Sequence, residues 1–165
     1  MDTIQNTRKV ISILVDNKPN TLARISSLVG RRNYNIETIT ASETHMPGVT
    51  LITLVVTDSD PDILEQIVAH IEKLEVVREV HVMDNNGGLY RELLLLKVMV
   101  DKKSRSSLLE TAEVFRARII DLSKSSLIIE LTGEPAKIDG FMDLMSDYEL
   151  VEVCRTGVTG MSRGL

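Results

Sequence analysis

The chain has 165 residues, which is enough for one medium-sized domain or two small ones. Its formal net charge is −5 and its isoelectric point is about 5.2, so the basic surface typical of nucleic-acid-binding proteins is not expected. Hydrophobic residues make up 43% of the chain but aromatic residues only 3%, with no Trp, so the core is expected to consist of Ile, Leu, Val and Met.

The first half of the chain predicts six elements in the order strand, helix, strand, strand, helix, strand. In the first strand, Ile11, Ile13 and Val15 share one face at a spacing of two. In the helix that follows, Leu22, Ile25, Leu28 and Val29 recur at helical spacing. The predicted ranges are about 8–15, 20–31, 34–44, 49–57, 61–73 and 76–83.

Turn-forming residues lie between the first strand and the first helix. The run Asp16-Asn17-Lys18-Pro19-Asn20 is typical of a tight polar loop. The start of the following helix offers backbone N–H groups without partners and the positive end of the helix dipole. Such a junction suits a small carboxylate ligand, for example a free amino acid.

Two further signals mark the rest of the first half. Pro47-Gly48 predicts the hairpin turn between the second and third strands. Asp60 and Pro61 predict the start of the second helix, as its cap and its first helical residue. The resulting βαββαβ order is typical of the ferredoxin-like arrangement.

The second half repeats this order after the run Asp84-Asn85-Asn86-Gly87-Gly88, which indicates a linker. Glu134-Pro135 starts a helix there, as Asp60-Pro61 does in the first half. The predicted strands are 93–100, 118–123, 126–131 and 149–155, and a further helix includes residues 108–115. The fold class is therefore α+β, with two tandem sandwiches that each contain a four-stranded antiparallel sheet.

The single cysteine and the short apolar runs indicate where in the cell the protein is expected. Cys154 excludes an intramolecular disulfide, and we interpret it as a buried or half-buried structural thiol in the last strand. No signal-peptide pattern is visible, and the apolar stretch Leu93–Leu96 is far too short to span a membrane. These features favour a cytoplasmic protein without a membrane partner.

The segment 8–44 resembles an ACT domain, a module that senses small molecules in amino-acid metabolism. The run DNKPNTLARISSLVGRRNYNIETIT is similar to the N-terminal signature of the acetolactate (acetohydroxyacid) synthase small subunits, E-N-x-x-G-A/V-L-x-R followed by R-G-Y-N-I-E-S-L. FRARIID, at Phe115–Asp121, is similar to the opening of the family's second domain, and RTGVTGMSRG, at Arg155–Gly164, to its tail. Three separated motifs therefore agree in order over nearly the whole chain.

The resemblance implies a non-catalytic regulatory subunit of acetolactate synthase in valine, leucine and isoleucine biosynthesis. Its partner would be the catalytic large subunit, which carries thiamine diphosphate, magnesium and FAD, whereas this chain would hold no cofactor itself. The family's small subunits activate that partner and mediate feedback inhibition by valine. Residues 1–84 are expected to form the ACT domain for effector binding and homodimerisation, 85–90 the linker, and 91–165 the C-terminal domain.

The resemblance also implies an effector site shared between two subunits. The residues that match the valine site on one subunit are Asn17, Asn20, Thr21 and Leu22, and those from the neighbouring subunit are Asn35 and Ile36. Spacing alone favours a turn-forming role for the asparagines. Asn20 stands where the family usually has glycine, and asparagine also adopts the left-handed conformation.

Two other classes of function remain open. One is a stand-alone amino-acid sensor, which would have no catalytic partner. The other is a small enzyme similar to acylphosphatases, for which Arg24 and Asn17 would be the candidate pair, although no specific motif supports it. Neither a catalytic residue nor a metal site is predicted, because the three histidines lack metal-ligand spacing and Pro61 interrupts the acidic cluster that precedes the second helix.

Overall fold

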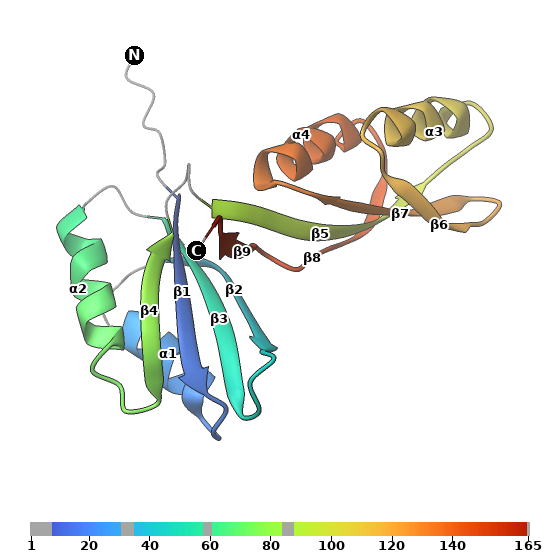
Figure 1. Ribbon diagram of the computed structural model, residues 1–165. Helices are drawn as coiled ribbons and strands as arrows, with labels where there is room; N and C mark the ends of the chain where they lie inside the picture. Colours follow the sequence, from blue (N-terminus) through green and yellow to red (C-terminus); the bar gives the residue numbers. More distant parts are fainter. Residues whose placement is uncertain (1–7, 31–34, 58–60, 84–87, 165) are drawn as a thin grey trace, which may run out of the picture. The chain divides into compact units, whose positions relative to one another are not determined.

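The computed structural model describes residues 8–30, 35–57, 61–83 and 88–164 (Figure 1). The chain divides into two compact units, Met1–Leu89 with Val158–Leu165, and Tyr90–Gly157. Among the sequence predictions, the helix cap at Asp60 and the linker up to residue 87 lie outside the described residues.

The first unit contains a four-stranded antiparallel sheet and two helices, which confirms the predicted ferredoxin-like order. The sheet has the strand order β2-β3-β1-β4. Its strands are β1 (Arg8–Asp16), β2 (Ile36–Glu43), β3 (Val49–Thr57) and β4 (Val77–Met83), and its helices are α1 (Thr21–Gly30) and α2 (Pro61–Ile71).

The core of the first unit lies between one face of this sheet and the two helices. The alternation predicted for β1 places Ile11, Ile13 and Val15 on this face, each without exposed surface, because alternate side chains of a strand share a face. Ile25 of α1 and Ile67 of α2 pack against the same cluster. The helices therefore cover one face, and β2 is left as an edge strand.

The second unit repeats this order of strands and helices, with the path β6-β7-β5-β8. Because β9 (Thr159–Ser162) also pairs with β5, this sheet has five strands instead of the predicted four. Leu94, Leu96 and Val98 of its central strand are buried against Phe141, whose ring meets that of Phe115 edge-on at 5.2 Å. The strands are β5 (Gly88–Met99), β6 (Arg118–Leu122), β7 (Ser126–Gly133) and β8 (Leu150–Arg155), and the helices are α3 (Ser104–Val114) and α4 (Pro135–Met145).

Cys154 corrects one expectation from the sequence. Its side chain is exposed, not buried or half-buried. The reason is its register: Cys154 lies opposite Leu95, so it is on the sheet face away from the buried Leu96 and the helices. β8 is also an edge strand, and nearby Val151 and Val153 are about half exposed, at 51% and 44%. The apolar composition of the run indicated a strand but not its place in the sheet.

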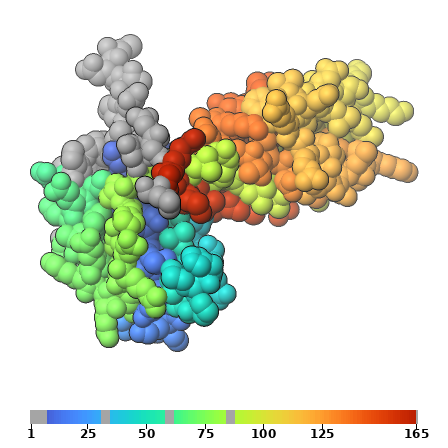
Figure 2. Space-filling view, viewed as in Figure 1, coloured from blue at the N-terminus to red at the C-terminus, as the bar shows by residue number. Residues whose placement is uncertain are grey.

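The C-terminal tail returns to the first unit. It contains the short strand β9 (Thr159–Ser162), and its last residues are visible in dark red in Figure 2. The Thr40 hydroxyl of β2 donates a hydrogen bond of 3.2 Å to the carbonyl oxygen of Val158, which is buried. By its contacts the tail groups with the first unit, whereas the sequence expectation counts it with the second domain.

Candidate functional site

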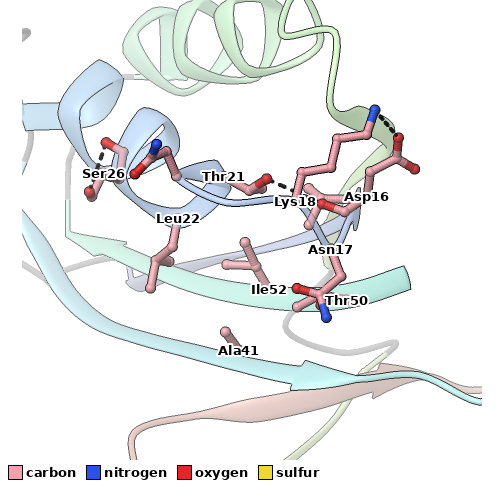
Figure 3. A pocket seen from close by; sticks show the side chains of 12 residues that line it. Asp16, Asn17, Lys18, Thr21, Leu22, Ser26, Ala41, Thr50 and Ile52 are labelled. Atoms are coloured by element: carbon pink, nitrogen blue, oxygen red, sulfur yellow. Dashed lines mark hydrogen bonds and ion pairs between the residues drawn. The ribbon is translucent and has the colours of Figure 1, made fainter. Parts of the chain in front are cut away.

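A pocket of about 520 Å³ lies in the first unit, between the start of α1 and the sheet (Figure 3). The residues that line it come from the β1–α1 loop, the first turns of α1, and strands β1, β2 and β3. They are Val15, Asp16, Asn17, Lys18, Asn20, Thr21, Leu22, Ala23, Ser26, Ala41, Thr50 and Ile52.

The loop that forms one wall is fixed by backbone hydrogen bonds. The Asn17 amide donates to the carbonyl oxygen of Gly48 at 2.8 Å, and the Lys18 amide donates to that of Asp16 at the same distance. The buried Thr21 hydroxyl also donates to the Asp16 carbonyl, at 3.2 Å. Since these bonds tie the loop to β1 and to the β2–β3 turn, the wall is shaped before any ligand arrives.

Asn20 turns the chain into α1 with a φ of +66°. This is the left-handed region that the sequence predicts for this position, and it costs most residues other than glycine and asparagine about 1–2 kcal/mol. The Arg24 amide donates to the Asn20 carbonyl oxygen at 3.0 Å, which starts the helix directly after the turn.

The start of α1 presents unpaired donors to the pocket. Within the described part of the chain, the backbone amides of Leu22 and Ala23 have no hydrogen-bond acceptor, and the first turn of α1 carries no acidic side chain. The positive end of the helix is therefore available to an anion. The arrangement can bind a carboxylate.

The charged residues beside this donor set neutralise one another. Asp16 pairs with Lys18 at 3.0 Å and with Arg78 at 2.6 Å. Hydrogen bonds from Lys18 and then from Arg78 hold the pKa of the Asp16 carboxyl below its ordinary value. Asp16 thus stays ionised and paired, and it ties the end of β1 to β4.

An apolar wall completes the pocket. Figure 3 shows the side chains of Leu22, Ile52 and Ala41 facing one another between α1 and the strands. Leu22 is 45% exposed in the single chain, so part of its side chain is open to a ligand. A ligand with a small branched apolar side chain would cover the exposed part of Leu22.

The structure brings four of the six predicted site residues together, namely Asn17, Asn20, Thr21 and Leu22. Asn35 and Ile36 do not line this pocket. They lie at the start of β2, and the register of β2 with β3 puts Ile36 opposite Val56, whereas Ala41 in the pocket is opposite Ile52. At about 3.3 Å per residue, the two ends of β2 are too far apart to meet one ligand within a chain.

Sequence reasoning missed five pocket residues that follow Leu22 in the chain, and Ala23 comes directly after it on α1. Ser26 lies one turn into α1, and Ala41, Thr50 and Ile52 lie on the helix-facing side of β2 and β3. The strand 49–57 and the turn at Pro47-Gly48 were predicted from the sequence, but the strand register that places Ala41 and Thr50 beside α1 was not.

A second hollow of about 490 Å³ lies between α1 and α2. Arg24 lines this hollow together with His70, whereas Asn17 lines the first pocket. The pair that a small enzyme similar to acylphosphatases would need is therefore split between two hollows.

Two kinds of feature are absent from the described ranges, a metal-binding cluster and a membrane-spanning helix. In those ranges no group of three His, Cys, Asp or Glu side chains is placed to hold a metal ion. Of the helices seen there, none is both long enough and apolar enough to cross a membrane.

Replacing Asn20 with alanine is expected to destabilise the first unit by about 1 kcal/mol, because alanine is strained at this positive φ. Asn20→Gly should be neutral or slightly stabilising, since glycine adopts this conformation freely. Urea unfolding of the full chain measures both changes. Asn35→Ala is the matched control at an exposed position without positive φ, and equal losses for Asn20→Ala and Asn35→Ala would contradict the assignment.

Comparison with known proteins covers both units. A family model described as the AHAS small subunit-like ACT domain matches residues 11–79, and one described as the small subunit of acetolactate synthase matches residues 91–164. The second match includes most of the tail that the structure groups with the first unit.

Individual relatives agree with these models. A probable acetolactate synthase small subunit of Methanothermobacter thermautotrophicus is 39% identical over 156 residues, which cover 94% of this chain and 92% of that protein. The acetolactate synthase small subunit of Bacillus subtilis is 35% identical over 157 residues, which cover 95% and 91%. The crystal structure of the acetolactate synthase small subunit from Thermotoga maritima matches with a TM-score of 0.89 and 33% identity, over 96% of this chain and 99% of that one.

Proposed function

The chain belongs to the family of acetolactate synthase small subunits, and on this premise we propose that it activates a catalytic large subunit and makes it sensitive to valine. The reaction of the partner would then be a controlled step of branched-chain amino-acid biosynthesis. The observation that supports the sensing role is the pocket at the start of α1, which combines free amide donors with an apolar wall.

Each part of valine has a counterpart in this pocket. The carboxylate would accept hydrogen bonds from the amides of Leu22 and Ala23, at the positive end of α1. The branched side chain would cover Leu22 and Ile52. The ammonium group needs acceptors, and the side-chain oxygen of Asn17 is suited to that role.

We further propose that a homodimer completes the site. β2 is an edge strand, and antiparallel pairing of two β2 strands about a two-fold axis would place the start of one opposite the end of the other. Asn35 and Ile36 of the partner subunit would then approach the Ala41 end of β2, beside the pocket. This arrangement explains why the two residues lie far from the pocket of their own chain.

The catalytic partner is proposed to supply the thiamine diphosphate, magnesium and FAD chemistry, while this chain binds the effector. The ACT domain, 1–84, would sense valine, and residues 91–165 would form the second domain of the subunit. Valine would favour one arrangement of the complex, and coupling of this kind typically amounts to about 1–3 kcal/mol.

Calorimetric titration with valine, leucine, isoleucine and alanine tests the sensing role, and assays of the large subunit with and without this chain test the regulatory role. We expect saturable binding with a preference for a branched amino acid, higher activity of the large subunit when the chain is added, and reversal by valine. Absence of any effect on the large subunit, with binding intact, would instead support a stand-alone sensor.

A further inference from the structure

One side chain beside the pocket has no role in the function proposed above. Glu43, the last residue of β2, is exposed and lies opposite Thr50 of β3 in the strand register. It faces the same side of the sheet as Ala41, because the two are two residues apart on one strand. Glu43 therefore stands just beyond the part of the pocket that Ala41 and Thr50 line.

Glu43 contacts the pocket through Asn17. The side-chain nitrogen of Asn17, Nδ2, donates a hydrogen bond of 3.3 Å to Oε1 of Glu43. A carboxylate only accepts hydrogen bonds, so the amide nitrogen of Asn17, and not its oxygen, must be turned towards Glu43. The oxygen on the other branch of the carboxamide is then the atom that Asn17 offers to the pocket it lines.

The charges around the pocket distinguish Glu43 from Asp16. Asp16 is compensated by Lys18 and Arg78, whereas Glu43 has no cationic partner within the described ranges. The pocket thus has the positive end of α1 on one side and an uncompensated carboxylate beside Asn17 on the other. This polarity matches a zwitterion, whose carboxylate and ammonium group would each face the opposite charge.

We propose that Glu43 is a positioning residue of the effector site, which holds the Asn17 carboxamide so that its oxygen accepts a hydrogen bond from the α-ammonium group of the effector. The inference rests on the proposed function, because it concerns the same pocket. It adds a determinant of selectivity, since a ligand with a hydroxyl group in place of the ammonium group makes only a neutral hydrogen bond with the Asn17 oxygen that Glu43 orients.

The test compares valine with 2-hydroxy-3-methylbutanoate, which keeps the carbon skeleton and the carboxylate. In Glu43→Lys the lysine donates to the Asn17 oxygen and turns the carboxamide over, so its NH₂ group faces the ammonium group. We expect valine affinity to fall by about tenfold or more and affinity for the hydroxy acid to change far less. Glu43→Ala, which frees the carboxamide without adding a cation, should lose selectivity in the same direction.

Glu43→Gln is the conservative variant. The glutamine oxygen accepts the same hydrogen bond from Asn17, so valine affinity should stay within about threefold of the wild type. Glu65→Lys, an equal charge change at an exposed position of α2, is the matched control and should leave both affinities unchanged. Sedimentation confirms that all variants are compared in the same oligomeric state.

The outcomes separate this inference from the function on which it rests. If the wild-type chain binds neither valine nor another branched amino acid, the proposed sensing role itself is wrong. If the wild type binds valine but Glu43→Lys and Glu43→Ala keep its preference over the hydroxy acid, Glu43 does not position Asn17. An equal loss for both ligands would also overturn the inference, because it would show a purely structural effect.

Discussion

Replacement of Arg155 with methionine is expected to destabilise the second unit by about 3 kcal/mol. Arg155, the last residue of β8, pairs through Nη2 with Glu92 and through Nη1 with Asp139 at 2.8 Å. The Glu92 side chain is only 4% exposed, so the loss of Arg155 leaves a buried carboxylate without a cation. Because Glu92 lies on β5, Arg155 on β8 and Asp139 on α4, these bonds join three elements of the second unit.

The Arg155 guanidinium keeps its positive charge in the folded protein. Burial alone lowers the pKa of this guanidinium, but the hydrogen bonds that it donates to Glu92 and Asp139 raise the pKa by more, so the net direction is upward. Arg155 therefore stays protonated at any pH at which the fold is studied. The expected loss in Arg155→Met reflects the stranded Glu92 carboxylate rather than a titration of the arginine.

Urea unfolding of the full chain, with hydrogen exchange of the β5 and β7 amides, would measure the loss in the second unit. Arg118→Met is the matched control, because Arg118 is 79% exposed and 3.8 Å from Glu130, and it should cost less than about 1 kcal/mol. The double replacement Arg155→Met with Glu92→Leu should recover much of the stability, since no charge is then stranded. Equal losses for Arg155→Met and Arg118→Met would contradict the buried-pair account.

The predictable parts of this fold are those whose signal is local. The period of two in β1 and the helical spacing in α1 each indicated a buried face, and Ile11, Ile13, Ile25 and Val29 are buried as predicted. Two members of the predicted helical stripe differ, because Leu28 is only partly buried and Leu22 is 45% exposed at the pocket. Duplication of the βαββαβ order then predicted both sheets. Short and peripheral segments were harder to predict from the sequence. β9 has only four residues, and its sequence does not show with which unit it groups.

The residues of the candidate site divide in the same way, into those that local sequence predicts and those that depend on strand pairing. The four residues Asn17, Asn20, Thr21 and Leu22 meet in the pocket because they lie on one continuous loop and helix start. Thr50 and Glu43 depend on the register between β2 and β3, which arises from tertiary pairing. The exposure of Cys154 likewise depends on the register between β5 and β8, which puts it on the face without helices.

The effector site proposed to be shared between two subunits makes a second prediction, which concerns both chains of the dimer. Asn17→Ala and Asn35→Ala homodimers should each bind valine about 10–100-fold more weakly, because each lacks a hydrogen bond to a charged group at both sites. In a heterodimer of the two variants, one site keeps both asparagines and the other loses both. The heterodimer should therefore bind one valine with nearly wild-type affinity, half the stoichiometry of the wild-type dimer.

Recovery of wild-type valine affinity in the heterodimer depends on whether Asn35 contributes to the site of its own chain or to that of the partner subunit. If Asn17 and Asn35 served a site within one chain, both sites of the heterodimer would be damaged and no wild-type affinity would return. The register of β2 argues against that arrangement, since it separates Ile36 from Ala41 along the strand. Heterodimers isolated through two different affinity tags and titrated by calorimetry decide between the cases. Wild-type binding by the Asn35→Ala homodimer would show instead that the edge of β2 takes no part in recognition.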